Sequence, residues 1–215
     1  MNVAVFGSTE RMGGLLVAGA LGRAHVVTAF ETGRPARDEP ATGAANGRLR
    51  TARGDLLDPV AVAAALAGQD AVLYGVEPPG GRERTTRASQ GVHGVVGAMR
   101  EAGVRRLVCL SIGGPGREPD GDPAGLVTRL FRSSPAKGAL ADLRHMEVTV
   151  RQSGLDWTIA RPARLIDGEG KHSWRSGPGY ALPHGTKIAR ADVAEFMLDQ
   201  LDDRANVGHA VAVAW

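Results

Sequence analysis

Two glycines near the start of the chain have the spacing of a phosphate-binding turn. Gly7 follows the apolar run Val3–Phe6, and Gly13 comes six residues later, just before the apolar stretch Leu15–Leu21. A buried strand, a glycine turn and a helix N-terminus together can hold the pyrophosphate of a dinucleotide, because the helix's first N–H groups and its dipole favour an anion. We therefore expect dinucleotide contacts from Gly7, Ser8, Thr9, Arg11, Met12 and Gly13.

Glu10 departs from this pattern, because it stands where a middle glycine usually lets the backbone approach the phosphate. A side chain and a negative charge at that point both weaken phosphate binding, unless Arg11 compensates or Glu10 turns outward. Two glycines at this spacing also fit a strand-to-helix turn without a ligand. The rest of the chain has to separate these alternatives.

Charged residues follow the second apolar run, Val26–Phe30. At this place in a dinucleotide fold, an acid binds the ribose of NAD, whereas an arginine accommodates the phosphate of NADP. The sequence offers Glu31 first and then Arg34 and Arg37, and solvated charges on a loop fit equally well. The choice between NAD and NADP stays open, with NADP slightly favoured.

Apolar runs with strand character alternate with longer helical segments along the chain. Asp58 before Pro59 is typical of a helix start, and Gly103 is typical of a helix end. Further strands are expected at 48–53, 70–74, 106–111, 157–161 and 210–214, and further helices at 60–66, 85–102, 139–153 and 191–201. This alternation predicts an α/β fold with a Rossmann-like, doubly wound, mainly parallel sheet and helices on both faces.

The 215 residues are expected to form a single domain, 1–215. Its longest irregular segments lie near 113–136 and 167–185, the first containing a short amphipathic piece at 126–131. Both follow expected strands and would lie over one end of the sheet, so we predict that they form lids over a substrate pocket.

Composition argues against several classes of partner. The net charge is only +3 with acids and bases interspersed, and aromatic residues make up 4%, so no nucleic-acid partner is expected. No apolar stretch reaches the length of about 18 residues that a membrane helix needs, and no membrane partner is expected. The chain begins directly with a strand, and its single cysteine, Cys109, lies in an apolar run, which together favour a reduced, cytoplasmic protein.

Five segments in order resemble the atypical short-chain dehydrogenase/reductase superfamily. The likeness spans nearly the whole chain and is greatest to NAD(P)H-binding proteins similar to flavin/biliverdin reductase B and the nitrogen-metabolite-repression regulators. It rests on residues 3–13, 54–59, 102–111, 153–162 and 188–194. The resemblance implies a pyrophosphate over the first glycine turn, and a substrate between the nicotinamide and the loop at 161–162. The other implied cofactor contacts are Asp55 and Leu56 near adenine, and Gly75, Val76 and Ser111 near nicotinamide. Arg34 is a further expected cofactor contact because of its place after the second apolar run, not because of the resemblance.

The superfamily's catalytic tyrosine and lysine are missing. They lie four residues apart on the helix after the fifth strand, and a glutamate follows the lysine by four. If Glu147 is that glutamate, Leu143 stands at the lysine position and Ala139 at the tyrosine position. Neither side chain can donate a proton, which excludes catalysis by a tyrosine–lysine pair, and the loss of the lysine also removes a ribose contact.

Two other residues are candidates for catalysis. Ser111 ends the fifth expected strand, where it can hydrogen-bond a substrate carbonyl or the nicotinamide amide, or simply satisfy backbone groups. His145 can act as an acid near neutral pH if its helix is rotated as Glu147 suggests; otherwise it is solvated or structural. Asp142 is a weaker candidate. The residues His172, Trp174, Tyr180 and His184 either line the pocket of an aromatic substrate or pack within their loop.

These observations lead to one expected function and two alternatives. We expect an NAD(P)H-dependent reductase that transfers hydride directly to a small planar substrate such as a flavin or quinone, with solvent or a weak acid as the proton source. The alternatives are a non-redox enzyme of secondary metabolism on a repurposed fold with an impaired cofactor site, and a non-enzymatic NAD(P)-sensing regulator. No spacing indicates a metal site, and the protein is expected to be a monomer or a homodimer.

Overall fold

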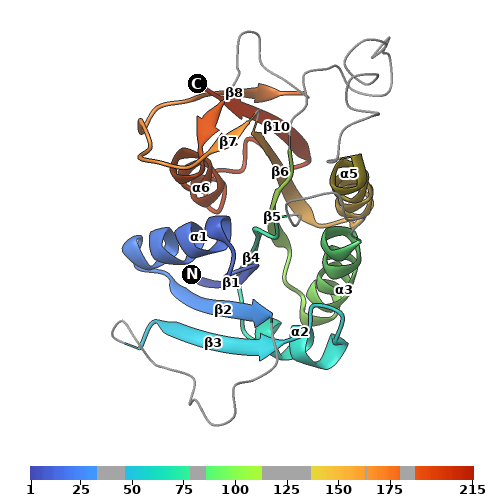
Figure 1. Ribbon diagram of the computed structural model, residues 1–215. Helices are drawn as coiled ribbons and strands as arrows, with labels where there is room; N and C mark the ends of the chain where they lie inside the picture. The colour runs from blue at the N-terminus through green and yellow to red at the C-terminus, as the bar shows by residue number, and fades with distance from the viewer. Residues whose placement is uncertain (33–46, 78–85, 113–136, 163, 180–186) are drawn as a thin grey trace.

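The computed structural model describes residues 1–32, 47–77, 86–112, 137–162, 164–179 and 187–215 (Figure 1). Its strands are β1 Asn2–Phe6, β2 Val26–Thr32, β3 Leu49–Gly54, β4 Ala71–Tyr74, β5 Arg106–Leu110, β6 Asp156–Pro162, β7 Leu165–Ile166, β8 Arg175–Pro178, β9 Ile188–Ala189 and β10 His209–Ala214. Its helices are α1 Arg11–Gly22, α2 Pro59–Leu66, α3 Arg87–Ala102, α5 Lys137–Arg151 and α6 Arg190–Asp199. Within these ranges, the helices are too short or too polar to cross a membrane.

Eight strands form one sheet in the order β3-β2-β1-β4-β5-β6-β10-β8. The neighbours are parallel except for β8, which pairs antiparallel with β10. Helices α1 and α6 cover one face, and α2, α3 and α5 cover the other (Figure 1). This confirms the predicted doubly wound α/β fold. The chain reverses direction across the sheet between β1 and β4, and ligands of such sheets bind beyond the strand ends at this switch point.

The central strands are mostly apolar because helices cover them on both sides. In β1, the segment Val3–Phe6 is fully buried, with side chains directed alternately to the two helical layers. Cys109 on β5 is also fully buried, as predicted, and this burial raises the pKa of its thiol.

The helix termini combine predicted caps with one long-range cap. The Asp58 carboxylate accepts the N–H of Val60 at 2.9 Å, and Gly103 ends α3 with a φ of +71°, both as the sequence predicted. The N-terminus of α3 is capped instead by Asp142 of α5, whose carboxylate accepts the N–H groups of Ala88 and Ser89 at 3.0 Å each. Asp142 therefore joins two helices, a role that its sequence neighbours do not reveal.

The prediction from the sequence missed three short strands and misplaced several strand ends by one or two residues. β6 continues through Pro162, and β7 pairs with β9 in a separate two-stranded ladder. β8 lies inside the segment 167–185 that was expected to be irregular, and it forms the edge of the main sheet. Its residues Arg175–Pro178 lack an apolar face and are largely exposed, so no periodicity marks them. The first expected lid, 113–136, lies outside the described residues, and both lids stay predictions.

Helix α1 packs unusually close to the turn that precedes it. A Cβ atom at Gly13 would lie 1.9 Å from the carbonyl oxygen of Gly7 and 2.7 Å from the Cα of Ser8. These neighbours are backbone atoms, which cannot move aside without displacing the turn. Gly13 therefore sets how near the first turn of the helix comes to the end of β1.

We predict that Gly13→Ala lowers the free energy of unfolding by about 1–3 kcal/mol, because overpacking outweighs the helix propensity of alanine. Gly14→Ala on the same helix turn is the matched control, since no atom lies within 4 Å of its added Cβ. It should stabilise the protein by up to about 1 kcal/mol. Urea unfolding of both variants measures the difference, and equal effects would show that the close approach at Gly13 carries no energetic cost.

Candidate functional site

The candidate site lies where β1 and β4 end, at the switch point of the sheet. Gly7 leaves β1 with a φ of +84°, a left-handed conformation that favours glycine. A Cβ there would lie 2.9 Å from the backbone nitrogen of Val76 and 3.0 Å from the carbonyl carbon of Gly75. The structure thus brings together three of the expected cofactor residues from two segments.

The backbone of this turn fits a dinucleotide diphosphate. Both glycines of the motif stand where a side chain would fill the space or strain the chain, and the first turn of α1 opens directly onto the turn. Ser8 donates its hydroxyl to the carbonyl of Phe30 at 2.8 Å, which ties the turn to β2, and Thr9 is exposed. The donor groups of the helix N-terminus are therefore in place for an anion.

Glu10 neither turns outward nor pairs with Arg11. Its side chain is 18% exposed; one carboxylate oxygen accepts the N–H of Glu77, and the other lies 3.7 Å from Nη2 of Arg87. Burial raises the pKa of Glu10, an effect that the Glu77 N–H and the Arg87 charge partly offset. Arg11 instead donates to Asp167. Glu10, the residue that departs from the glycine motif, is thus hydrogen-bonded to the segment after β4.

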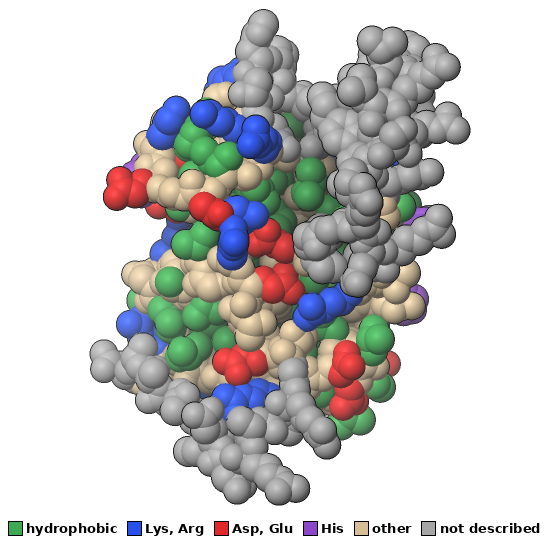
Figure 2. Space-filling view, viewed as in Figure 1, with side chains coloured by type: hydrophobic (Ala, Val, Ile, Leu, Met, Phe, Trp, Pro, Cys, Tyr) green, Lys and Arg blue, Asp and Glu red, His purple; other side chains and the backbone are tan. Residues whose placement is uncertain are grey.

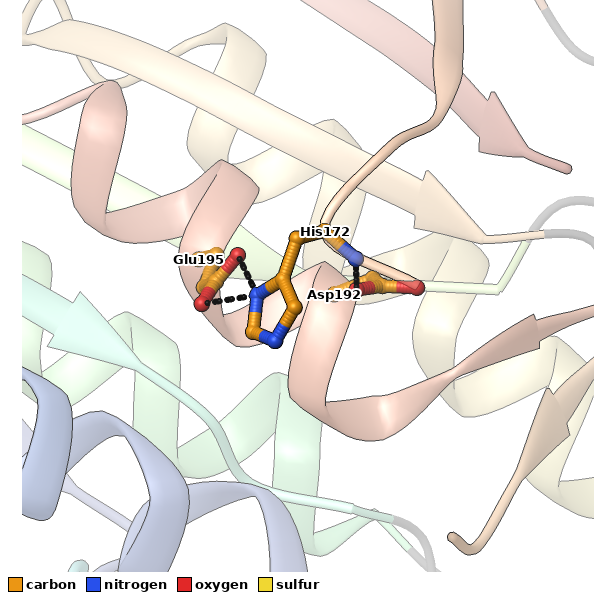
Figure 3. Close-up of side chains that lie close together, drawn as sticks. All are labelled: His172, Asp192 and Glu195. Atoms are coloured by element: carbon orange, nitrogen blue, oxygen red, sulfur yellow. Dashed lines mark hydrogen bonds and ion pairs between the residues drawn. The ribbon is translucent and has the colours of Figure 1, made fainter. Parts of the chain in front are cut away.

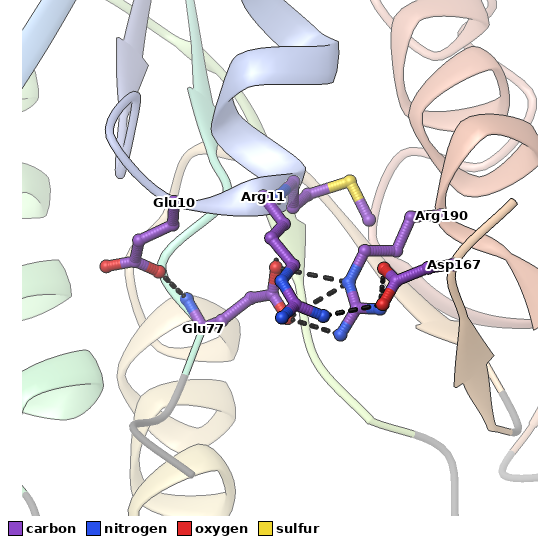
Figure 4. A network of polar contacts seen from close by, with 6 residues as sticks. Glu10, Arg11, Glu77, Asp167 and Arg190 are labelled. Atoms are coloured by element: carbon purple, nitrogen blue, oxygen red, sulfur yellow. Dashed lines mark hydrogen bonds and ion pairs between the residues drawn. The ribbon is translucent and has the colours of Figure 1, made fainter.

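A second carboxylate, that of Glu77, lies at the N-terminus of α1, and no sequence motif marked it. Glu77 accepts the backbone N–H of Met12 at 3.0 Å. The same carboxylate accepts Nη2 of Arg190 at 3.0 Å and Nε at 3.2 Å, and Nη1 of Arg190 donates to Asp167 at 2.7 Å (Figure 4). Acidic and basic side chains consequently alternate across the middle of this face (Figure 2).

The residues expected to recognise adenosine lie at the ends of β2 and β3. Glu31 accepts Nε of Arg53 at 2.9 Å, so the acid after β2 already has a cationic partner. Asp55 is exposed and accepts the N–H of Leu57 at 3.0 Å, while Leu56 is buried. Arg34 and Arg37 lie outside the described residues. These contacts leave the choice between NAD and NADP undecided.

Ser111 belongs to a buried polar network at the end of β5. Its hydroxyl donates to Oε1 of Glu147 at 2.6 Å, and Nε of Arg161 donates to the same oxygen at 2.9 Å. Arg161 also binds the second oxygen of Glu147 and the carbonyl of Gly179. All three network side chains are nearly inaccessible, so the proton of Ser111 is already engaged by an anion.

His145 points away from this network. On α5, Leu143 and Glu147 are buried against the sheet, whereas His145 is exposed. Two residues along an α-helix correspond to a rotation of about 200°, so Glu147 and His145 lie on nearly opposite sides. The helix is rotated as Glu147 indicated, but this rotation turns His145 to solvent and not toward the expected site.

His172, Asp192 and Glu195 come within 4.8 Å of one another, although no spacing in the sequence indicated a metal site (Figure 3). The ring of His172 pairs with Glu195 at 2.9 Å, which raises the pKa of the histidine. The buried carboxylate of Asp192 accepts the N–H groups of Lys171 and His172 and the indole N–H of Trp215. Asp192 thus fixes the loop before β8 and the C-terminus onto α6.

Comparisons with solved structures support this fold assignment along the whole chain. A short-chain dehydrogenase/reductase from Veillonella parvula DSM 2008, solved in complex with NADP, matches with a TM-score of 0.78 and 17% identity, over 100% of this chain and 94% of the other. ChuY, an anaerobillin reductase from Escherichia coli O157:H7, matches with a TM-score of 0.77 and 22% identity, over 100% and 97%. A protein from Burkholderia pseudomallei matches with a TM-score of 0.76 and 25% identity over both full lengths.

A search of curated proteins found no match. The family model for NAD(P)H-binding proteins, in contrast, matches residues 7–204, which begin at the first glycine of the turn and end after α6. The chain therefore belongs to the NAD(P)H-binding family of Rossmann-like proteins.

Proposed function

We propose that this protein is an NAD(P)H-dependent reductase of a small, planar, electron-poor substrate such as a flavin or a quinone. The observation that carries the proposal is the glycine cradle at the β1–β4 switch point, formed by Gly7 and Gly13. Bound reduced nicotinamide supplies the hydride, so the protein needs mainly to bind and orient its ligands. An anaerobillin reductase among the similar structures is consistent with reductase chemistry on this fold.

The polar network at the end of β5 suits an orienting role. Because the Ser111 hydroxyl donates its hydrogen bond to Glu147, the hydroxyl oxygen is left as an acceptor. An acceptor at this strand end can receive the amide N–H of a nicotinamide ring, which fixes the face presented to the substrate. Arg161 holds Glu147 through both carboxylate oxygens, and this fixes the serine rotamer in turn.

The absence of a tyrosine–lysine pair matches substrates that need no strong acid. Leu143 is buried at the position of the lysine, Ala139 stands at that of the tyrosine, and His145 faces solvent. Ser111 cannot protonate a substrate without giving up its bond to Glu147. A reduced flavin or quinone can take its proton from water, whereas a simple ketone requires a positioned acid.

A non-redox enzyme on the same fold is the second candidate. The carboxylates of Glu10 and Glu77 favour it, since both lie at the place where a dinucleotide would bring its phosphates. In that case the residues at the strand ends would bind a metabolite without a nicotinamide ring.

We predict saturable heat when NADPH or NADH is titrated into the protein at submillimolar concentrations. AMP is the matched control: it carries the adenosine without the diphosphate and should give no saturation in that range. Oxidation of the bound dinucleotide by added flavin or quinone, followed at 340 nm, then tests the reductase. If neither dinucleotide gives heat at millimolar concentration, the reductase proposal fails and the second candidate is favoured.

We further predict that Ser111→Ala lowers kcat/KM by roughly 5- to 10-fold, equivalent to one hydrogen bond of about 1 kcal/mol. His145→Ala should leave the rate within about twofold of wild type, and the wild-type pH profile should show no inflection near 6.5, the ordinary pKa of histidine. A hundredfold loss in the His145 variant together with such an inflection would make His145 the acid and contradict the solvent route.

A further inference from the structure

Glu77 occupies the place in the cradle that an anionic ligand requires. Its carboxylate accepts the N–H of Met12, which is the second residue of α1. An N–H group in the first helical turn has no intrahelical acceptor and is directed at whatever anion lies at the N-terminus. A diphosphate seated on this turn needs the same donor, so the two anions exclude each other.

Arg190 is the cation that this carboxylate binds most extensively. It is the first residue of α6 and approaches Glu77 through both Nε and Nη2, and the pair is mostly buried, with 16% and 19% of the side chains exposed. The hydrogen bonds to Glu77 raise the pKa of Arg190, which therefore stays charged. Its Nη1 is held separately by Asp167. The guanidinium thus keeps an anchor beside the cradle if Glu77 moves away.

Glu10 explains how Glu77 comes to lie there. The carboxylate of Glu10 accepts the backbone N–H of Glu77. The residue that departs from the glycine motif therefore fixes the backbone of the residue that fills the cradle. Glu10 and Glu77 act as one unit: the first places the strand-end segment, and the second supplies the anion.

We propose that Glu77 is an internal carboxylate that competes with the cofactor's diphosphate for the N-terminus of α1, and that Arg190 binds the diphosphate once Glu77 is displaced. This inference rests on the proposed dinucleotide function and deepens it. Arg190 exchanges a carboxylate for a phosphate, a ligand that its planar, forked donors match equally well. Only the fraction of molecules in which Glu77 has left the N-terminus of α1 can bind NADP(H). The apparent affinity is lowered in proportion to that fraction.

The main test compares wild type with Glu77→Gln by calorimetric titration with NADP⁺ and, separately, with inorganic pyrophosphate. Glutamine keeps the shape of the side chain but loses the charge that holds Arg190, so we expect the Kd for both ligands to fall at least tenfold. Glu195→Gln is the matched control. It removes the same charge from an acid that pairs with His172, and it should leave both Kd values unchanged.

Unfolding of the unliganded variant supplies an independent readout. Glu77→Gln should lower Tm without ligand, because the helix cap and the ion pair weaken, while it tightens ligand binding. Opposite signs of the two effects distinguish competition from a general improvement of the fold. Glu77→Asp is the second variant, one methylene shorter, and we expect it to tighten binding as well.

Arg190 is tested in the Glu77→Gln background. Arg190→Gln should abolish the gain in affinity, because the freed guanidinium is the group that binds the diphosphate. Undiminished affinity in this double variant would overturn the role of Arg190. Equal, measurable binding by wild type, Glu77→Gln and Glu77→Asp would overturn the competition and leave the proposed function standing. Absence of NADP⁺ binding in every variant would overturn both.

Discussion

The close approach of α1 to the end of β1 is the constraint on which the rest of the site depends. Gly13 lies against the carbonyl of Gly7, so the first turn of the helix faces the switch point of the sheet at short range. N–H groups in this position need a hydrogen-bond acceptor, and the helix dipole favours one that carries a negative charge. In this protein a side chain of the chain itself, Glu77, provides it. In the mechanism that we propose, the affinity for a dinucleotide depends on competition between the Glu77 carboxylate and the diphosphate, and not on the glycine motif alone.

The charges at the strand ends connect segments that are far apart in the sequence. Arg190 joins the end of β4 to the start of α6 through Glu77, and Asp167 receives both Arg190 and Arg11. Behind this layer, Glu147 and Arg161 form a nearly inaccessible ion pair. A buried pair of this kind is costly to break by removing one partner, because the other charge is left unpaired. The inner pair, Glu147 and Arg161, suits the orientation of a nicotinamide ring. The outer pair, Glu77 and Arg190, suits the replacement of a carboxylate by a phosphate.

The order of strands and helices could be predicted because the buried strands are mostly apolar and because local caps such as Asp58 and Gly103 mark helix ends. β8 could not be predicted, since an exposed edge strand carries no apolar pattern. At the site, the sequence revealed Glu10 as an anomaly but not its partner, because Glu10 contacts Glu77 across 67 positions. The outward direction of His145 could have been predicted, because His145 lies two residues from Glu147 and therefore on nearly the opposite side of the helix. The roles of Ser111 and His145 in catalysis stay predictions.

A crystal structure of the protein with NADP⁺ tests the central claim most directly, because it shows which anion the N-terminus of α1 holds. We predict that the diphosphate accepts the N–H of Met12, that the Glu77 carboxylate has left this position, and that Arg190 contacts a phosphate oxygen while keeping Asp167. A complex in which Glu77 still accepts the Met12 N–H, with the dinucleotide bound elsewhere along the strand ends, would contradict the competition between the two anions.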